Sequence, residues 1–272
     1  MCYDIAIQKR RELKLEHRYG KDPEKIKLLE EELRTWSENN MAKYYASGFD
    51  HPLLPVRSNL EPTKIQGFEW GLIPSGTSNL TEATRLSTFT LNARSEDMFV
   101  TKSYKEPARF KRCVIYVDSF FEHHHQGIKR TYPFVIRKKD HTQMALAGLW
   151  DSWTDPQTGE VHKTTAIVTT RANEALAIIH NGKRAQETGP RMPVILPGEL
   201  EDSWLKPFES EDYKRFFHDL CLAYPFDLLE YYSVLSLKGK NGVGNSMLAL
   251  EPYLHLDLLK IYAELPPFPY SP

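Results

Sequence analysis

Short apolar runs rich in β-branched and aromatic residues follow one another through the middle of the chain, and they constrain its fold most. They span residues 113–117, 132–137, 144–150 and 164–170. Runs of this length and composition predict buried strands. Parallel neighbours need a long crossover connection, usually a helix, and no long helical pattern separates these runs. The sequence therefore predicts a largely antiparallel sheet system.

Helical patterns lie mainly on either side of this region. Apolar residues at helical spacing predict one long or broken amphipathic helix over residues 22–47, which Gly48 ends. Combined with the strands, these helices predict an α+β fold. Further elements are expected as strands at 64–70 and 88–91, an extended or mixed segment at 228–237, and helices at 173–179, 211–223 and 254–265.

Composition limits the classes of function. The formal net charge is −1, so a DNA-binding surface would have to be local. The basic stretches 105–112 and 129–139 could supply one, although such clusters are more often solvated faces. No apolar run is long enough to span a membrane or to act as a signal peptide. With three widely spaced cysteines, we expect a cytoplasmic protein with reduced thiols.

Cys2 stands where a cysteine can carry two nucleophiles. Removal of Met1 would leave a free α-amine next to the thiol, and both groups have reactive fractions near neutral pH. The amine can condense with an aldehyde to a Schiff base, and the thiol can then close a thiazolidine ring. The alternative is a buried or incidental cysteine.

Two polar clusters could carry further chemistry. In the first, Asn92 offers an amide and Arg94 a fork that fits phosphate, although a loop with a capping residue has the same composition. In the second, Glu122 follows an apolar strand and two aromatic residues, which makes it a candidate general acid. An exposed carboxylate at a strand end is the alternative.

The histidines allow different interpretations. His123, His124 and His125 would alternate faces in a strand, so they cannot converge on one metal ion, and we expect no metal site. Asn173 is typical of a helix N-cap, and His180 closes the same helix. A histidine there is either a cap that complements the helix dipole or a proton shuttle.

Five motifs follow one another in order along nearly the whole chain. They are Met1-Cys2, Trp70-Gly71-Leu72-Ile73-Pro74, Asn92-Ala93-Arg94-Ser95-Glu96, Phe121-Glu122, and His180 followed by Arg191-Met192-Pro193. This set resembles the ordered motifs of the SOS response-associated peptidase (SRAP) family. The resemblance implies a single α+β domain over residues 1–272, with mainly antiparallel β-sheets forming a barrel-like core, flanking helices and a cleft for single-stranded DNA.

The resemblance also implies a function. Members of this family form a covalent DNA–protein cross-link at abasic sites in single-stranded DNA during the DNA damage response. Carried over by motif, Cys2 would attack the opened sugar and Asn92 would position both. Glu122 would transfer protons, and His180 would assist protonation and reversal. The family also implies DNA contacts by Trp70 (stacking or wedging), Arg94 (phosphate), Thr169 (a supporting hydroxyl) and Arg191.

The chain departs from the family pattern at three places, one of which is the amphipathic stretch over residues 22–47, which we expect to be lengthened. Tyr3-Asp4 stands where the family usually has Gly-Arg, which removes a cation beside the nucleophile. An insert over residues 181–190 separates His180 from Arg191 by more than the usual spacing.

Two other functions remain open at this point. One is a cysteine-dependent peptidase of the N-terminal nucleophile type, which would need an oxyanion hole and a peptide groove. The other is a non-enzymatic module that binds single-stranded DNA without using Cys2. For the chain itself we expect a monomer that needs no cofactor.

Overall fold

Five strands close into a barrel in the computed structural model, which describes residues 2–7, 23–39, 43–127, 130–207 and 212–266. The strands pair in the order β10-β4-β3-β6-β9, and β9 pairs again with β10 to close the ring. All these pairs are antiparallel except β10–β4. The expected mainly antiparallel, barrel-like core is confirmed. Its strands are β3 (Leu53–Ser58), β4 (Gln66–Trp70), β6 (Arg112–Val117), β9 (Met144–Thr154) and β10 (Val161–Arg171).

Residues 113–117 of strand β6 are all apolar because both faces of the strand are covered. Successive side chains of a strand point to opposite faces. Cys113, Ile115 and Val117 join one hydrophobic cluster. Val114 and Tyr116 join a second, which includes Trp204 of helix α6 (Gly198–Leu205). The indole nitrogen of Trp204 donates a 2.9 Å hydrogen bond to the carbonyl of Cys113, which fixes the helix on the barrel.

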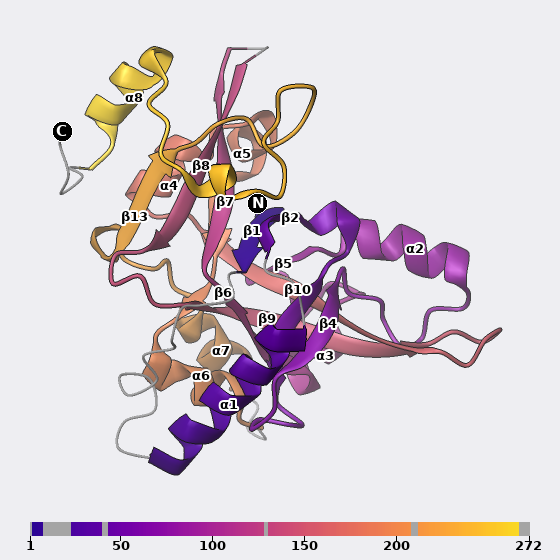
Figure 1. Ribbon diagram of the computed structural model, residues 1–272. Coiled ribbons are helices and arrows are strands. Elements are labelled where there is room, and N and C mark those ends of the chain that lie inside the picture. The colour runs from indigo at the N-terminus through magenta and orange to yellow at the C-terminus, as the bar shows by residue number, and fades with distance from the viewer. Residues whose placement is uncertain (1, 8–22, 40–42, 128–129, 208–211, 267–272) are drawn as a thin grey trace.

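A second, five-stranded antiparallel sheet continues directly from the barrel (Figure 1). Only Asp118 separates the end of β6 from the start of β7, and its amide donates to the carbonyl of Ala6. The N-terminal strand β1 is therefore held between β7 and β2. The order of the sheet is β13 (Leu229–Ser233), β8 (Arg130–Lys138), β7 (Ser119–Gln126), β1 (Asp4–Ile7) and β2 (Lys43–Ser47).

Short strands extend the barrel next to the site. Strand β5 (Asn92–Arg94) runs parallel to β10, and β11 (Arg191–Pro193) pairs antiparallel with the same strand. Strand β12 (Ile195–Leu196) pairs with β9. These additions place Asn92 and Arg191 on the two sides of one barrel strand.

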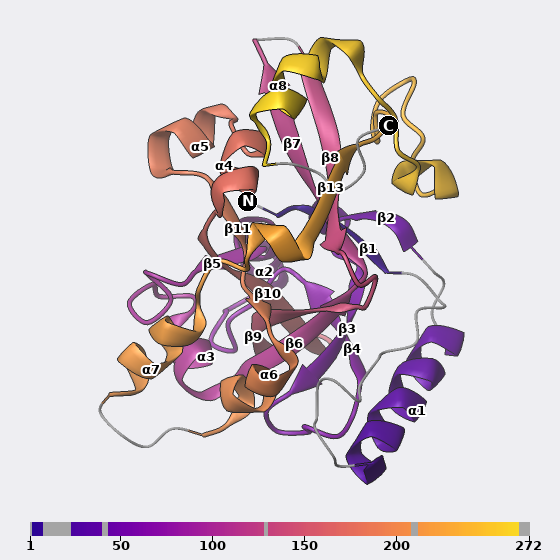
Figure 2. The same cartoon turned by 90° about the vertical axis from the view of Figure 1, so that its left-hand side faces the viewer.

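Helices cover the outside of both sheets (Figures 1 and 2). In the described part of the chain, no helix is long and apolar enough to cross a membrane. The remaining helices are α1 (Pro23–Asn39), α2 (Leu80–Phe89), α3 (Lys105–Phe110), α4 (Glu174–Ile179), α5 (Lys183–Thr188), α7 (Tyr213–Leu220) and α8 (Leu259–Glu264).

Two predictions of secondary structure are wrong. Residues 43–47 form strand β2 instead of continuing a helix, because pairing with β1 sets Ser47 opposite Asp4. Residues 88–89 belong to helix α2 instead of a strand. Asn79 starts that helix by accepting the amide of Glu82, a local N-cap that the sequence displays.

Two further expectations need correction. Glu122 is not at a strand end, because β7 continues to Gln126 and the side chain of Glu122 is buried. In the basic stretch 105–112, Arg112 is buried and donates to the carbonyl of Trp204. This guanidinium therefore stabilises the packing of α6 and adds nothing to a basic surface.

Candidate active site

Cys2 lies two residues before strand β1, which pairs with β7. Its side chain is fully buried, and its thiol lies 3.8 Å from the carbonyl oxygen of Asp4. The next residue is fixed by the amide of Gly48, which donates to the carbonyl of Tyr3 at 2.7 Å. The antiparallel register that pairs Asp4 with Phe121 brings this end of β1 toward Glu122.

Asn92 links the barrel to the N-terminus. The parallel pairing of β5 with β10 places Asn92 opposite Ile167, and its Nδ2 donates a 2.8 Å hydrogen bond to the carbonyl of Cys2. Its Oδ1 is buried and has no hydrogen-bond partner among the described residues. A buried amide oxygen without a donor costs free energy, so this atom is a ready acceptor for an N–H group at the site.

Glu122 and His180 form a second buried pair, and the charge of Glu122 acts on the Cys2 thiol. Glu122 comes from β7 and His180 from the C-terminal cap of α4, and Oε2 lies 3.6 Å from Nδ1. The same Nδ1 lies 2.9 Å from the carbonyl oxygen of Arg191 and 3.1 Å from its amide nitrogen. The backbone of one residue can thus satisfy either tautomer of the ring.

The burial of these groups determines their protonation. Burial, reinforced by the charge of Glu122, raises the pKa of the Cys2 thiol well above its ordinary value. Burial lowers the pKa of His180, although the charge of Glu122 opposes that shift. The site therefore combines a protonated thiol with a neutral imidazole beside Glu122. Such a set can accept a proton from a nucleophile and return it later.

The structure places three of the predicted DNA contacts inside the protein. Trp70 is fully buried and its indole donates to the carbonyl of Leu91, so no face of the ring is available to a base. Thr169 is also fully buried, and its hydroxyl accepts a hydrogen bond from Nε of Arg191. Arg191 is buried too and holds Glu96 with both terminal nitrogens, at 3.0 and 2.6 Å.

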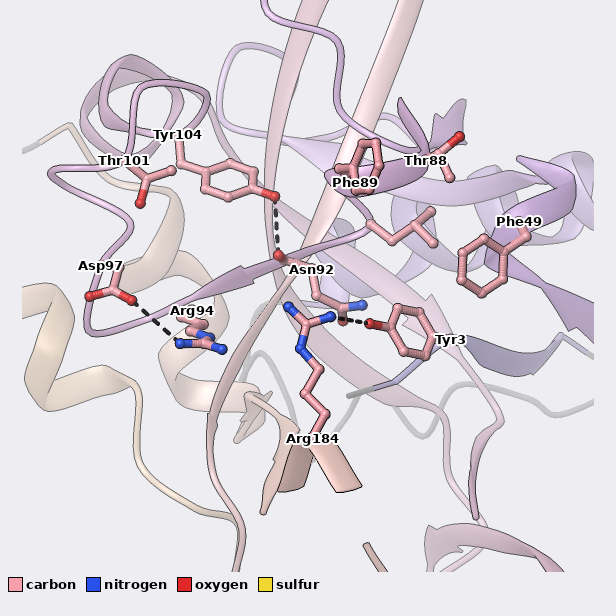
Figure 3. Close-up of a pocket in the computed structure, with 11 residues that line it drawn as sticks. Tyr3, Phe49, Thr88, Phe89, Asn92, Arg94, Asp97, Thr101, Tyr104 and Arg184 are labelled. Atoms are coloured by element: carbon pink, nitrogen blue, oxygen red, sulfur yellow. Dashed lines mark hydrogen bonds and ion pairs between the residues drawn. The ribbon is translucent and has the colours of Figure 1, made fainter. Parts of the chain in front are cut away.

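Arg94 is the predicted DNA contact that lies at a pocket. The pocket has a volume of about 390 Å³ and is lined by Asn92, Arg94, Tyr3 and Arg184 among others (Figure 3). Arg94 is partly exposed and lies 4.0 Å from the carboxylate of Asp97. Phe49 and Phe89 stand at the pocket with half or more of their surface exposed. The pocket thus combines cations and aromatic rings, with Asn92 as the link to Cys2.

Tyr3 and Arg184 line the same pocket but are not among the site residues predicted from the sequence. Tyr3 was noted only as a departure, and Arg184 lies in the insert, whose role the sequence left open. An arginine in an insert cannot be recognised as a site residue from its type alone, because exposed arginines are common. Its place at the pocket depends on the path of the insert through space.

The described residues include no group of three or more histidine, cysteine or carboxylate side chains that could hold a metal ion. His124 instead places Nδ1 at 3.0 Å from the carbonyl oxygen of Ile178, which joins β7 to α4. All three cysteines are unpaired thiols and buried.

Fold and site together define a class of protein: a mainly antiparallel barrel in which an asparagine bonds the backbone of a second-position cysteine and the glutamate of a Glu–His pair acts on its thiol. The chain belongs to the SOS response associated peptidase (SRAP) family, whose model matches residues 1–240. The resemblance carried by the five motifs is thereby confirmed.

Several known proteins are similar to this chain. Abasic site processing protein YoqW of Bacillus subtilis is 30% identical over 208 residues, covering 73% of this chain and 85% of that protein. Abasic site processing protein HMCES of Gallus gallus is 30% identical over 160 residues, covering 52% and 45%. A crystal structure of a protein from Bacteroides thetaiotaomicron has a TM-score of 0.74 at 28% identity, covering 93% of this chain and all of that chain.

Proposed function

We propose that this protein traps abasic sites in single-stranded DNA covalently, through Cys2 after removal of Met1. The observation that carries the proposal is that Asn92 lines the pocket and bonds the carbonyl of Cys2, while the charge of Glu122, the partner of His180, acts on the buried Cys2 thiol. The names of similar proteins support it, because YoqW and HMCES are both called abasic site processing proteins.

The proposed reaction is a condensation. An abasic sugar opens to an aldehyde, and the α-amine of Cys2 attacks its carbonyl carbon. Loss of one water gives an imine. The thiol then adds across the C=N bond: sulfur bonds to carbon, the thiol proton passes to nitrogen, and a thiazolidine results. No oxidant or cofactor is consumed, and the ring protects the imine from hydrolysis.

Asn92 and Glu122 have distinct roles in this scheme. The buried Oδ1 of Asn92 accepts an N–H of the α-amine, while Nδ2 keeps the carbonyl of Cys2 in place. The hydrogen bond orients the amine through its N–H, so the lone pair of the nitrogen stays available to attack the carbonyl carbon. Glu122 takes the proton that the α-ammonium must lose before attack and passes it to the ring oxygen of the sugar, which increases the fraction of open aldehyde.

His180 completes the proton path. As a neutral imidazole next to Glu122, it accepts the proton that leaves the amine or the thiol, and it returns that proton when the adduct reverses. The high pKa of the buried thiol fits this order, since the thiol stays protonated until the imine is in place.

The DNA contacts divide into direct and supporting ones. Arg94 lies at the pocket and would hold a phosphate next to the lesion. The exposed rings of Phe49 and Phe89 suit stacking of unpaired bases. Trp70, Thr169 and Arg191 are buried, so they would hold strands β5 and β11 in place from within the protein.

The experiment mixes protein with single-stranded DNA carrying one abasic site and separates the products on a denaturing gel. Wild type gives a heat-stable shifted band. Cys2→Ala keeps an α-amine but has no thiol, so its imine hydrolyses and the band is lost unless borohydride reduces it. Cys221→Ala, which removes another buried thiol, serves as the control and keeps the band.

Two outcomes would overturn the proposal. A stable band of normal intensity from Cys2→Ala would exclude thiazolidine formation. Absence of any adduct from wild type lacking Met1, together with Cys2-dependent cleavage of peptides, would favour the peptidase alternative.

A further inference from the structure

The insert between α4 and β11 is fastened to the rest of the protein at both ends. At its start, Asn181 exchanges two hydrogen bonds with the backbone of His125, at 2.7 and 2.9 Å. At its end, the amide of Ala172 donates to the carbonyl of Pro190 at 3.0 Å. Helix α5 between these points therefore has a defined position beside β7 (Figure 2).

This position brings Arg184 of α5 to the pocket. Its guanidinium donates to the hydroxyl of Tyr3 at 3.4 Å, as Figure 3 shows. In the part of the chain that the structure describes, no carboxylate lies within ion-pair distance of Arg184. Arg94 and Arg191 differ, because each faces a carboxylate. Among the described residues, the guanidinium of Arg184 thus contacts a neutral hydroxyl and no carboxylate.

Tyr3 is itself held in place. Gly48 fixes its carbonyl, and its ring packs against Phe49 with centroids 5.2 Å apart. Asp4, the next residue, is buried among other partners: Tyr45 donates to its carboxylate at 2.9 Å and Lys238 lies 3.3 Å away. The only acidic group next to Tyr3 in sequence is therefore already neutralised.

We propose that Arg184 binds a phosphodiester of the DNA strand next to the abasic site and that Tyr3 positions its guanidinium. The inference rests on the proposed function for the identity of the strand. An arginine fork matches phosphate geometry, and the exposed aromatic rings at the same pocket fit the bases that accompany a phosphate better than they fit an isolated anion. The insert thus supplies a cation where Tyr3-Asp4 provides none.

The test uses single-stranded DNA with a tetrahydrofuran abasic analogue, which cannot open to an aldehyde. Association constants are measured over a range of salt concentrations for wild type, Arg184→Gln, Arg184→Lys and Arg34→Gln. Arg34 is an exposed arginine of α1 away from the pocket, so its substitution removes the same charge from another place.

Loss of one phosphate contact on a single strand reduces the slope of log K against log salt by about 0.7. We expect that reduction for Arg184→Gln, with affinity about tenfold lower at low salt because a charge-assisted contact is lost. Arg184→Lys keeps the charge and most of the slope, and Arg34→Gln behaves as wild type. Tyr3→Phe weakens binding and leaves most of the slope, since it releases the guanidinium without removing it.

A salt slope for Arg184→Gln equal to that of Arg34→Gln would overturn the inference. Because the analogue forms no adduct, this result is independent of covalent capture. Failure of wild type to cross-link a natural abasic site would instead remove the proposed function, so the two failures are distinguishable.

Discussion

Asn92 shows how a single amide can serve both structure and chemistry. Its Nδ2 ties the N-terminus to the barrel, and its Oδ1 is left buried without a partner among the described residues. Its backbone carbonyl is fixed as well, by the hydroxyl of Tyr104 at 3.0 Å. A side chain held this firmly can orient an incoming amine at little entropic cost.

Glu122→Gln should slow cross-linking. The amide keeps the size of the side chain but cannot donate or accept the proton of a carboxyl group, and general acid–base catalysis contributes about 10²-fold or more. Single-turnover rates at saturating DNA measure the effect. A rate equal to that of wild type would remove Glu122 from the proton path.

His180→Ala provides the comparison at the same site. If His180 returns protons during reversal, this variant releases the adduct more slowly, and its effect on release exceeds its effect on formation. Release is followed by capture on an excess of unlabelled abasic DNA. Unchanged release from His180→Ala would leave the histidine as a helix cap only.

At the scale of elements, the sequence patterns predicted the positions of most strands but not which strands pair with one another. Residues 164–170 and the N-cap at Asn173 were predicted because β-branched runs and capping side chains act locally. Strand β2 was missed because pairing with β1, a tertiary interaction, decides its conformation. The motifs likewise predicted Cys2, Asn92, Glu122 and His180 as site residues, and the structure pairs Asn92 with Cys2 and Glu122 with His180. The place of Arg184, in contrast, depends on how the insert is anchored.

The ion pair between β11 and the segment after β5 predicts a pH dependence of stability. Partial burial alone would raise the pKa of Glu96, but the hydrogen bonds and charge of Arg191 outweigh it and lower the pKa to about 2. The unfolded value is about 4.3. Between these values the unfolded state binds more protons, so stability is lost as pH falls from about 5 to 2.

Glu96→Gln should remove this contribution. The variant is less stable than wild type at pH 7, and the difference shrinks at pH 3, as urea midpoints at both values would show. Because the Glu96 carboxylate is partly exposed, solvent screens the ion pair and the loss of stability is modest. Glu106→Gln on the exposed side of α3 is the control. An equal loss for Glu96→Gln at both pH values would contradict the linkage.

At the scale of the molecule, the antiparallel character followed from the sequence, whereas closure of the barrel did not follow from local patterns. Closure requires β10 to pair with β4 in parallel as well as with β9, and a long connection separates β4 from β10. Local patterns cannot specify such a contact. The resemblance implied it, and the structure confirms it. That residues 1–272 form a single domain stays a prediction.

Gly148 lies in β9 at a point where the barrel interior leaves no room for a side chain. A Cβ at this position would lie 2.7 Å from the sulfur of Cys113 and 2.8 Å from Cδ1 of Ile115. Gly148→Ala should therefore destabilise the protein by about 1–3 kcal/mol, the usual cost of overpacking. Urea denaturation measures it, with Gly76→Ala as control because a Cβ there meets no atom within 4 Å. Equal stability of the two variants would mean that the barrel can expand locally.

The central claim is that the α-amine and thiol of Cys2 together capture the abasic aldehyde, and intact mass spectrometry of the cross-linked product tests it most directly. The account predicts a mass equal to the protein without Met1 plus the DNA strand minus one water, and loss of free Cys2 thiol on peptide mapping. An adduct that retains Met1, or one attached at another residue, would contradict the account.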